Sequence, residues 1–211
     1  MHAFRQSLRL GEEVLRYANE RIDLRAADSV VETLIRCKGN RYFTGIGKSG
    51  LVAARMASSL SSIGLASHWI HASEWAHGEL GSLAKGDVVT AVSHSGSTVE
   101  LIWLAEQLEQ MRGMKDSSRE GIELIAFTGD AASKLAQHAS FVLTCETPPG
   151  SEALALLPTS SVVASHHVFN AVLCECAARL SITAAEIAQN HPGGHVGRVA
   201  VHHEALRKGK H

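Results

Sequence analysis

The sequence predicts an α/β protein with three layers, α/β/α, built around a parallel sheet. Short apolar runs, rich in β-branched residues, alternate with helical patterns at the spacing of strand–helix–strand crossovers. Glycine-rich or hydroxyl-rich turns follow several of these runs, where open α/β sheets bind ligands. With 211 residues, 45% of them hydrophobic, the chain suits one domain with an ample core. The expected strands are 41–45, 66–70, 88–92, 122–128 and 139–145.

The expected helices lie before and between these strands. Two amphipathic patterns at 2–23 and 26–38 precede the first strand and indicate packing or oligomer elements. Further helices are expected at 51–63, 99–112 and 131–138, and a long helix from Pro158 to about Leu180. Thr183 and Glu186 have capping-box spacing for a short last helix. The tail after Ala200 is expected to be frayed or extended.

The stretch from Val88 to Glu100 carries the first indication of function. An apolar run ends abruptly in Ser93-His-Ser-Gly-Ser-Thr98, and a helical pattern starts at Val99. A turn of this kind gathers hydroxyls and amide groups at a helix N-terminus, which attracts anions such as phosphate. An ordinary capped strand–helix turn is the alternative. The candidate phosphate-binding residues here are Ser93, Ser95, Gly96 and Thr98.

A second glycine-rich turn follows the strand at 41–45. Its sequence, Gly45-Ile-Gly-Lys-Ser-Gly50, fits the dinucleotide pattern G-x-G-x-x-G, but the next strand ends without an acidic residue to hold a ribose. A Walker A loop fails because Tyr42 occupies the position of its first glycine. The turn therefore suits a small phosphorylated ligand, to which Lys48 offers a positive charge and Ser49 a hydroxyl.

Two histidine-containing segments complete the candidates. In 71–81, Glu74 and His77 are three residues apart and would share a helix face, as an acid–base pair or as part of a capped surface helix. In 190–198, glycines and a proline surround His191, which indicates a loop of specific shape.

Composition narrows the classes of function. The net charge is −1 and the one basic block is at 207–210, so nucleic-acid binding has little support. No apolar run approaches the ~20 residues of a membrane span, and the first residues lack a signal-peptide core, so a cytoplasmic protein is expected. The four cysteines are spread out and are expected to be buried free thiols rather than metal ligands. No cofactor or metal is expected.

Five motifs in order resemble those of a known family. GIGKSG, the segment SEWAHGELG at 73–81, SHSGSTVE, LLPTSS and NHPGGHVGR are together similar to the sugar isomerase (SIS) domain of arabinose-5-phosphate isomerases, over about 26–199. The resemblance implies one SIS domain spanning 1–211, a flavodoxin-like fold with a five-stranded parallel sheet, and homotetramers with sites shared between subunits. It also implies interconversion of D-arabinose 5-phosphate and D-ribulose 5-phosphate, which feeds Kdo synthesis for lipopolysaccharide.

The resemblance also assigns residues. Ser93, Ser95 and Thr98 match the phosphate cradle, and the matching catalytic candidates are Lys48, His77, Glu100, Glu152 and His191. An aldose–ketose isomerisation through an enediol needs a carbon base, oxygen acid–base groups and a cation. We expect Glu152 to be the carbon base and Lys48 to stabilise negative charge. His191 or His77 would serve ring opening and proton transfer between the oxygens, and Glu100 would orient these groups or share in the proton transfer.

The sequence departs from the family pattern at three places. His94 stands where members commonly have Asn, and Ser97 where they have Glu. The segment before Pro158 is two residues shorter than usual, so Glu146 is a fallback for Glu152. The CBS modules that many members carry have no counterpart, so a single-domain member is expected. An isomerase for another phosphosugar and a non-catalytic sugar-phosphate-binding module remain the alternatives.

Overall fold

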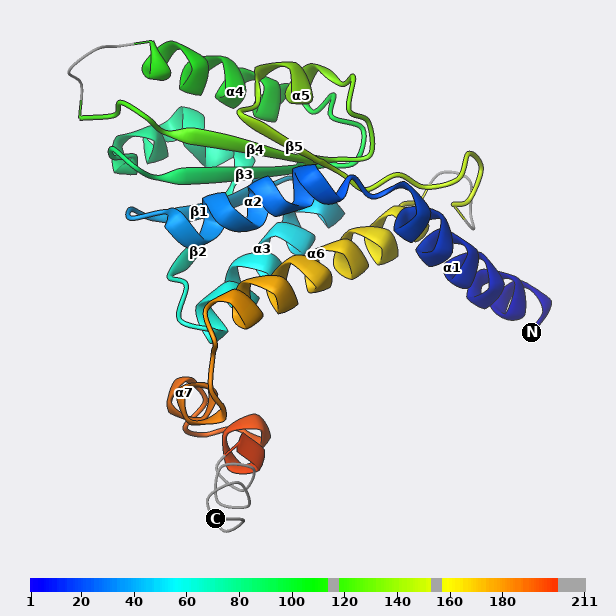
Figure 1. Cartoon of the computed structure of the whole chain (residues 1–211). Coiled ribbons are helices and arrows are strands. Elements are labelled where there is room, and N and C mark those ends of the chain that lie inside the picture. Colours follow the sequence, from blue (N-terminus) through cyan, green and yellow to red (C-terminus); the bar gives the residue numbers. More distant parts are fainter. Residues whose placement is uncertain (114–117, 153–156, 201–211) are drawn as a thin grey trace.

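The computed structural model describes residues 1–113, 118–152 and 157–200. Its centre is a five-stranded sheet in the order β2-β1-β3-β4-β5, in which every neighbouring pair is parallel (Figure 1). This is the flavodoxin-like order, and it confirms the expected fold class. The strands are β1 (Arg41–Gly45), β2 (Ser67–His71), β3 (Val88–Ser93), β4 (Glu123–Thr128) and β5 (Phe141–Thr144).

Helices cover both faces of the sheet, as three layers require. The helices are α1 (His2–Arg21), α2 (Leu24–Arg36), α3 (Gly47–Ser62), α4 (Val99–Arg112), α5 (Lys134–His138), α6 (Ser160–Arg179) and α7 (Ala184–Asn190). Helices α2, α3 and α6 lie on one face, and α4 and α5 lie on the other (Figure 1). Helix α1 packs against α6 rather than on the sheet.

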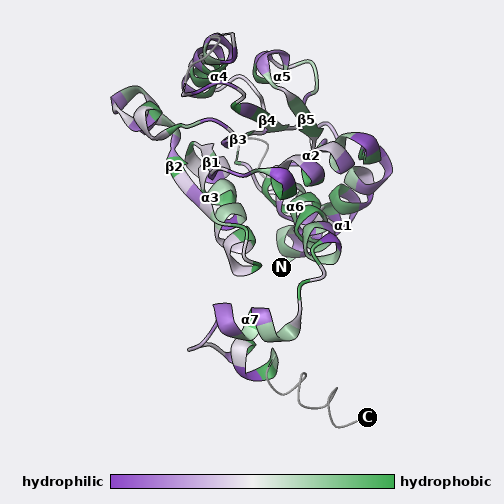
Figure 2. Ribbon diagram, turned by 60° about the vertical axis from the view of Figure 1, so that its left-hand side comes forward, coloured by the Kyte–Doolittle hydropathy of each residue, from purple (hydrophilic) through white to green (hydrophobic). Residues whose placement is uncertain are grey.

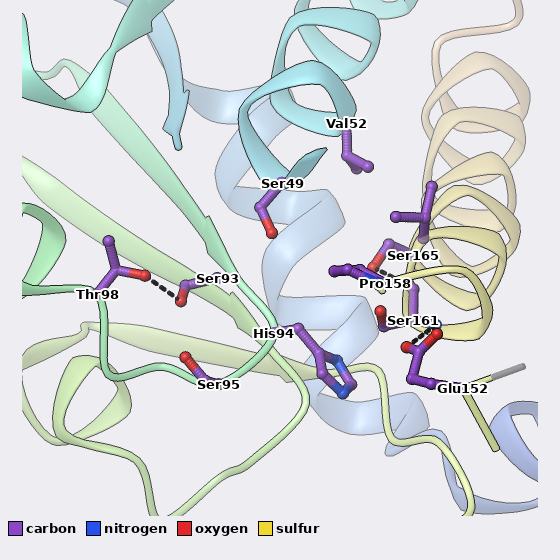
Figure 3. Close-up of a pocket in the computed structure, with 11 residues that line it drawn as sticks. Ser49, Val52, Ser93, His94, Ser95, Thr98, Glu152, Pro158, Ser161 and Ser165 are labelled. Atoms are coloured by element: carbon purple, nitrogen blue, oxygen red, sulfur yellow. Dashed lines mark hydrogen bonds between the residues drawn. The ribbon is translucent and has the colours of Figure 1, made fainter. Parts of the chain in front are cut away.

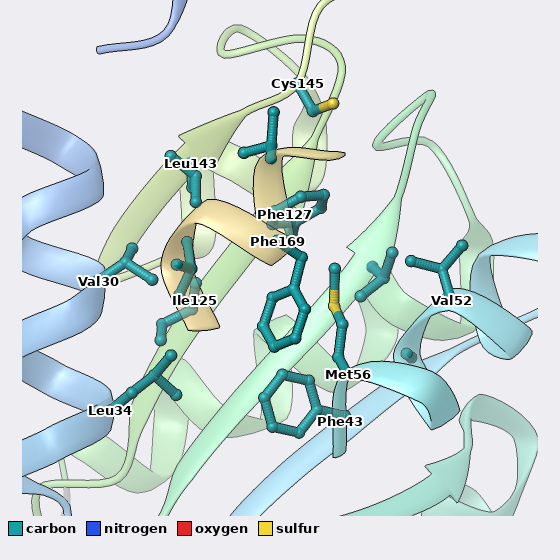
Figure 4. Close-up of a cluster of buried hydrophobic side chains, with 14 of the residues drawn as sticks. Val30, Leu34, Phe43, Val52, Met56, Ile125, Phe127, Leu143, Cys145 and Phe169 are labelled. Atoms are coloured by element: carbon teal, nitrogen blue, oxygen red, sulfur yellow. The ribbon is translucent and has the colours of Figure 1, made fainter. Parts of the chain in front are cut away.

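The core divides into two clusters because successive strand side chains point to opposite faces. Phe43 packs with Met56 and Phe169 beneath α3 and α6 (Figure 4). Its neighbour Tyr42 belongs to the second cluster, with Trp75 and the buried face of α4. The central strands β1, β3 and β4 are buried on both sides, which explains the mainly apolar sequences of β3 and β4.

Several boundaries differ from expectation. Helix α3 begins at Gly47 rather than at Leu51, because Gly45 and Gly50 lack side chains and let the helix start directly at the strand end. The segment after β2 forms two 3₁₀-helices, η1 (Ala72–His77) and η2 (Glu79–Ser82), whereas the spacing of Glu74 and His77 is compatible with one α-helix. The predicted capping box of α7 is present, with Thr183 and Glu186 each bonding the other's backbone amide.

The two ends of the described chain extend from the body. Helix α1 projects beyond the sheet, and α7 hangs from the far end of α6 (Figures 1 and 2). The apolar side chains of Phe4 and Leu8 on α1 are each 59% exposed. The expected tail lies outside the described residues from 201 onward, as does 153–156 of the apolar segment before Pro158.

Among the described helices, none alone has the length and hydropathy of a membrane span; α6 and α7 meet those criteria only as a pair bent by 117°.

Candidate functional site

A cavity of about 310 Å³ opens at the carboxyl ends of β1 and β3 (Figure 3). These two strands adjoin at the point where the strand order reverses, which is where open α/β sheets bind ligands. Four segments supply its lining: the start of α3, the turn after β3, the loop before α6, and the first turns of α6. The lining residues are Ser49, Val52, Ser93, His94, Ser95, Thr98, Glu152, Pro158, Ser161, Val162 and Ser165.

The serine turn, residues 93–98, forms one end of this cavity. Ser93 is buried at the end of β3, and its Oγ lies 2.9 Å from Oγ1 of Thr98. Gly96 has a φ of +57°, and a Cβ there would overlap the side chain of Ser133. The turn is therefore folded tightly against the segment before α5, and the Leu135 amide bonds the Gly96 carbonyl at 3.0 Å. This packing leaves the Ser95 side chain exposed at the cavity.

Two helices begin at the cavity without a side-chain cap. Thr98 is the N-cap of α4 and Ile46 that of α3, and neither side chain bonds the helix amides. The hydroxyl of Thr98 instead meets Ser93. First-turn amides of a helix have no intrahelical partner and carry partial positive charge. This end of the cavity is therefore suited to an anion.

The glycine turn brings the start of α3 close to the sheet. A Cβ on Gly50 would lie 2.9 Å from the carbonyl oxygen of Gly45, so these two backbones are in direct contact. The contact places Ser49 in the cavity wall, beside β3. The neighbouring side chain of Lys48 is exposed.

The opposite end of the cavity is held by Glu152. Its carboxylate accepts hydrogen bonds from the amides of Thr159, Ser160 (2.8 Å) and Ser161 (3.0 Å), and from the Thr159 hydroxyl (2.8 Å). Burial alone would raise the pKa of Glu152, but the hydrogen bonds from Ser161 and Thr159 outweigh it and lower the pKa to about 2. Glu152 is thus an ionised cap for α6 and a weak base.

His94 lies between these two ends (Figure 3). Its ring packs against Gly129, where a Cβ would lie 2.6 Å from Nδ1, and its Nε2 is 3.4 Å from the Thr147 hydroxyl. Burial lowers the pKa of His94, and the Glu152 charge opposes that shift in part. The imidazole is therefore neutral at neutral pH.

The cavity brings together half of the predicted site residues. Ser49, Ser93, Ser95, Thr98 and Glu152 line it. Gly96 is buried within the serine turn and is not part of the cavity lining. The described lining does not include the remaining candidates, Lys48, His77, Glu100 and His191, nor the fallback Glu146, whose carboxylate lies 3.9 Å from Arg21 Nε.

The two histidine candidates lie in separate parts of the fold. His77 ends η1 and is exposed. His191 follows α7, at the end of α6 away from the cavity, and its Nδ1 is 2.8 Å from the Ile187 carbonyl (Figure 1). A 20-residue α6 spans ~30 Å, so His191 does not reach the cavity of its own chain.

The residues that sequence reasoning missed are His94, Ser161, Ser165 and the apolar wall of Val52, Pro158 and Val162. Ser161 and Ser165 are four residues apart on α6, so the PTSS motif and helical spacing could have found both. His94 stood out only as a departure from the family pattern. Among the residues that the structure describes, no three His, Cys, Asp or Glu side chains gather as a metal site.

Comparison with known proteins identifies the family of the chain. The family model for the SIS domain matches residues 34–174. The arabinose 5-phosphate isomerase KdsD of Pseudomonas aeruginosa is 35% identical over 167 residues, covering 79% of this chain and 48% of that protein. The chain thus spans about half the length of the curated relatives it matches.

Solved structures give the same answer for the fold. The Escherichia coli CFT073 protein c3406, in complex with arabinose 5-phosphate, has a TM-score of 0.81 and 27% identity, covering 90% of this chain and 96% of its own. A protein of Listeria monocytogenes str. 4b F2365 has a TM-score of 0.82 and 24% identity, covering 91% and 96%, and shows the shared fold. With its cavity at the switch point of the sheet and two thirds of its length matched by the family model, the chain belongs to the SIS domain family.

Proposed function

We propose that this chain is an aldose–ketose isomerase that interconverts D-arabinose 5-phosphate and D-ribulose 5-phosphate. The observation that carries the proposal is that the two ends of the cavity differ: one end suits an anion and the other end already holds one. The serine turn and the uncapped starts of α3 and α4 suit a phosphate, whereas the α6 terminus is already occupied by the Glu152 carboxylate. A sugar phosphate would therefore bind with its phosphate at the serine turn and its carbon chain toward Glu152.

The reaction moves a proton between C1 and C2 through an enediol, with no net oxidation and no redox partner. It requires a carbon base, proton transfer between two oxygens, and a cation for the developing negative charge. In this proposal Glu152, which lines the cavity, is the carbon base, although its hydrogen bonds weaken its basicity. Lys48, exposed at the start of α3, can supply the cation by turning toward the cavity.

In this proposal the remaining catalytic candidates act at sites that form between subunits. His191 lies away from its own cavity, so it would serve the site of a neighbouring subunit in a homotetramer. His77 and Glu100, both exposed, would lie at or near such a shared site. We propose further that the enzyme acts in the cytoplasm, without nucleic acid or membrane partners, and that its product feeds Kdo synthesis.

A coupled assay of the purified chain with D-arabinose 5-phosphate tests the function directly. Turnover above ~1 s⁻¹, insensitive to EDTA, is the expected result. D-glucose 6-phosphate and D-fructose 6-phosphate, run in parallel, report on the alternative that the enzyme acts on a different phosphosugar.

A non-catalytic sugar-phosphate-binding module is the second candidate. The observation in its favour is that Glu152 is held as a weak base while Lys48 and His191 lie outside the cavity. Thermal stabilisation by D-arabinose 5-phosphate without turnover of any of the three sugars would establish this candidate and overturn the isomerase.

A further inference from the structure

The cavity contains a histidine for which the reaction outlined above has no role yet. The serine turn carries His94, whose imidazole can both accept and donate a proton near neutral pH. The ring lines the cavity between the phosphate end and the Glu152 end (Figure 3). A sugar bound with its phosphate at the serine turn would lay its carbons along this ring.

The ring is held in place from two directions. Gly129, in the turn after β4, leaves room for the imidazole, and its amide donates a 2.9 Å hydrogen bond to the His94 carbonyl. Thr147, in the loop before α6, lies 3.4 Å from Nε2. The buried Nδ1 has no hydrogen-bond partner among the described residues. The long contact at Nε2 leaves that nitrogen able to exchange Thr147 for a sugar hydroxyl.

We propose that His94 is a catalytic residue that carries the proton between the two oxygens of the enediol intermediate. This inference rests on the proposed isomerase function and deepens it. It gives the oxygen-to-oxygen transfer to a group of the same chain, where the resemblance gives it to His191 or His77.

The step balances without any further reactant. After the carbon base has taken the proton from C1 of the ketose, the O2 atom carries the negative charge and O1 still carries its proton. Neutral His94 accepts the O1 proton through Nε2 and returns it to O2. The ring begins and ends neutral, and the charge moves from O2 to O1, ready for the base to return its proton to C2.

The surroundings of the ring suit this role. From the loop before α6 the charged neighbour is Glu152, which favours the transient imidazolium. From the turn after β4 the acidic residue is Asp130, whose carboxylate accepts the Ala132 amide at 2.8 Å. From α3 the charged residue is Lys48, whose side chain is exposed. Burial keeps the resting pKa of His94 below its ordinary value, so the ring starts as a proton acceptor.

The test is the pH profile of kcat for the full chain and for two variants, His94→Asn and His94→Gln. Asn keeps a polar amide near the position of Nδ1 and Gln places one near the position of Nε2, but neither can carry a proton. We expect kcat to fall about 100-fold or more in both, within the usual range for acid–base groups, and the acidic limb of the wild-type profile to disappear. Thermal stabilisation by inorganic phosphate should persist, because the serine turn is unchanged.

The control is His138→Asn, which makes the same exchange on α5, where the ring pairs with an exposed carboxylate. It should leave kcat and the pH profile unchanged. If either His94 variant folds and turns over within about threefold of wild type, or keeps the acidic limb, the inference is wrong while the isomerase stands. If the wild-type chain turns over none of the three sugars, the proposed function fails and this inference fails with it.

Discussion

The backbone amide of Ser161 donates a 3.0 Å hydrogen bond to the carboxylate of Glu152, at the first turn of α6. Because of this contact, the two ends of the cavity differ in electrostatic character. An anion already occupies the α6 terminus, whereas the α3 and α4 termini at the other end have no side-chain cap. Because a phosphate dianion is repelled by one end and attracted by the other, one binding orientation is favoured.

Replacing Glu152 by Gln tests its two roles separately. The variant keeps an oxygen acceptor but loses the charge, so we expect a loss of about 0.5–2 kcal/mol in the free energy of unfolding near pH 7, as for other helix caps. If Glu152 is also the carbon base, kcat falls by roughly 10²–10⁴-fold. Urea unfolding and the coupled assay measure these effects, with exposed Glu106→Gln on α4 as the control.

The sign of the pH dependence follows from the lowered pKa of Glu152. The folded pKa is about 2 and the ordinary value is 4.5, so the ionised cap stabilises the fold above 4.5 and loses this contribution as the pH falls toward 2. The stability difference between wild type and Glu152→Gln should therefore shrink across that interval. A difference that stays constant from neutral pH to pH ~2.5 would contradict the assigned cap.

Lys48, unlike Glu152, is expected to contribute to catalysis but not to the stability of the fold. Its side chain is exposed, so Lys48→Met should change the free energy of unfolding by no more than about 0.5 kcal/mol. If the ammonium stabilises the developing oxyanion, kcat falls by about 10²-fold, and Lys48→Arg recovers part of it. Steady-state kinetics on both variants measure this, and a Met variant with unchanged kcat would exclude Lys48 from the reaction.

The local signals in the sequence were sufficient to predict the sheet and the serine turn at one end of the cavity. The apolar run 88–92 followed by Ser and Gly residues predicts both a buried strand and its turn, because each depends on neighbours in sequence. The structure confirms strand β3 there and places Ser93, Ser95 and Thr98 at the cavity. The PTSS motif likewise marks the start of α6.

The other end of the cavity depends on contacts that sequence patterns do not contain. The burial of His94 requires Gly129 and Thr147, which come from two other segments of the chain. The weak basicity of Glu152 arises from amides at the start of α6, which lie eight and nine residues further along the sequence. Motif matching identified Glu152 as a residue of the site but could not show that the fold uses its charge as a helix cap.

Gly96 tests whether the serine turn is the phosphate site. Gly96→Ala adds a Cβ at a φ of +57° that overlaps Ser133, so we expect a loss of stability of at least ~1–2 kcal/mol and weaker stabilisation by inorganic phosphate. Gly11→Ala, on α1 where a Cβ meets nothing within 4 Å, is the control and should be neutral or stabilising. Thermal unfolding with and without phosphate measures both. Phosphate stabilisation of Gly96→Ala equal to that of wild type would place the anion site elsewhere.

The position of His191 predicts complementation between subunits. The residue lies at the end of α6 away from its own cavity, so a site that uses it must take it from another copy. We expect His191→Ala and Glu152→Gln each to be nearly inactive when pure. After mixing, unfolding and refolding together, each mixed pair contains one site with both native residues, and activity returns to about a quarter of wild type. Two copies of the same variant refolded alone serve as the control. Absence of recovery, with both variants forming oligomers of wild-type size, would show that His191 does not act in a neighbouring site.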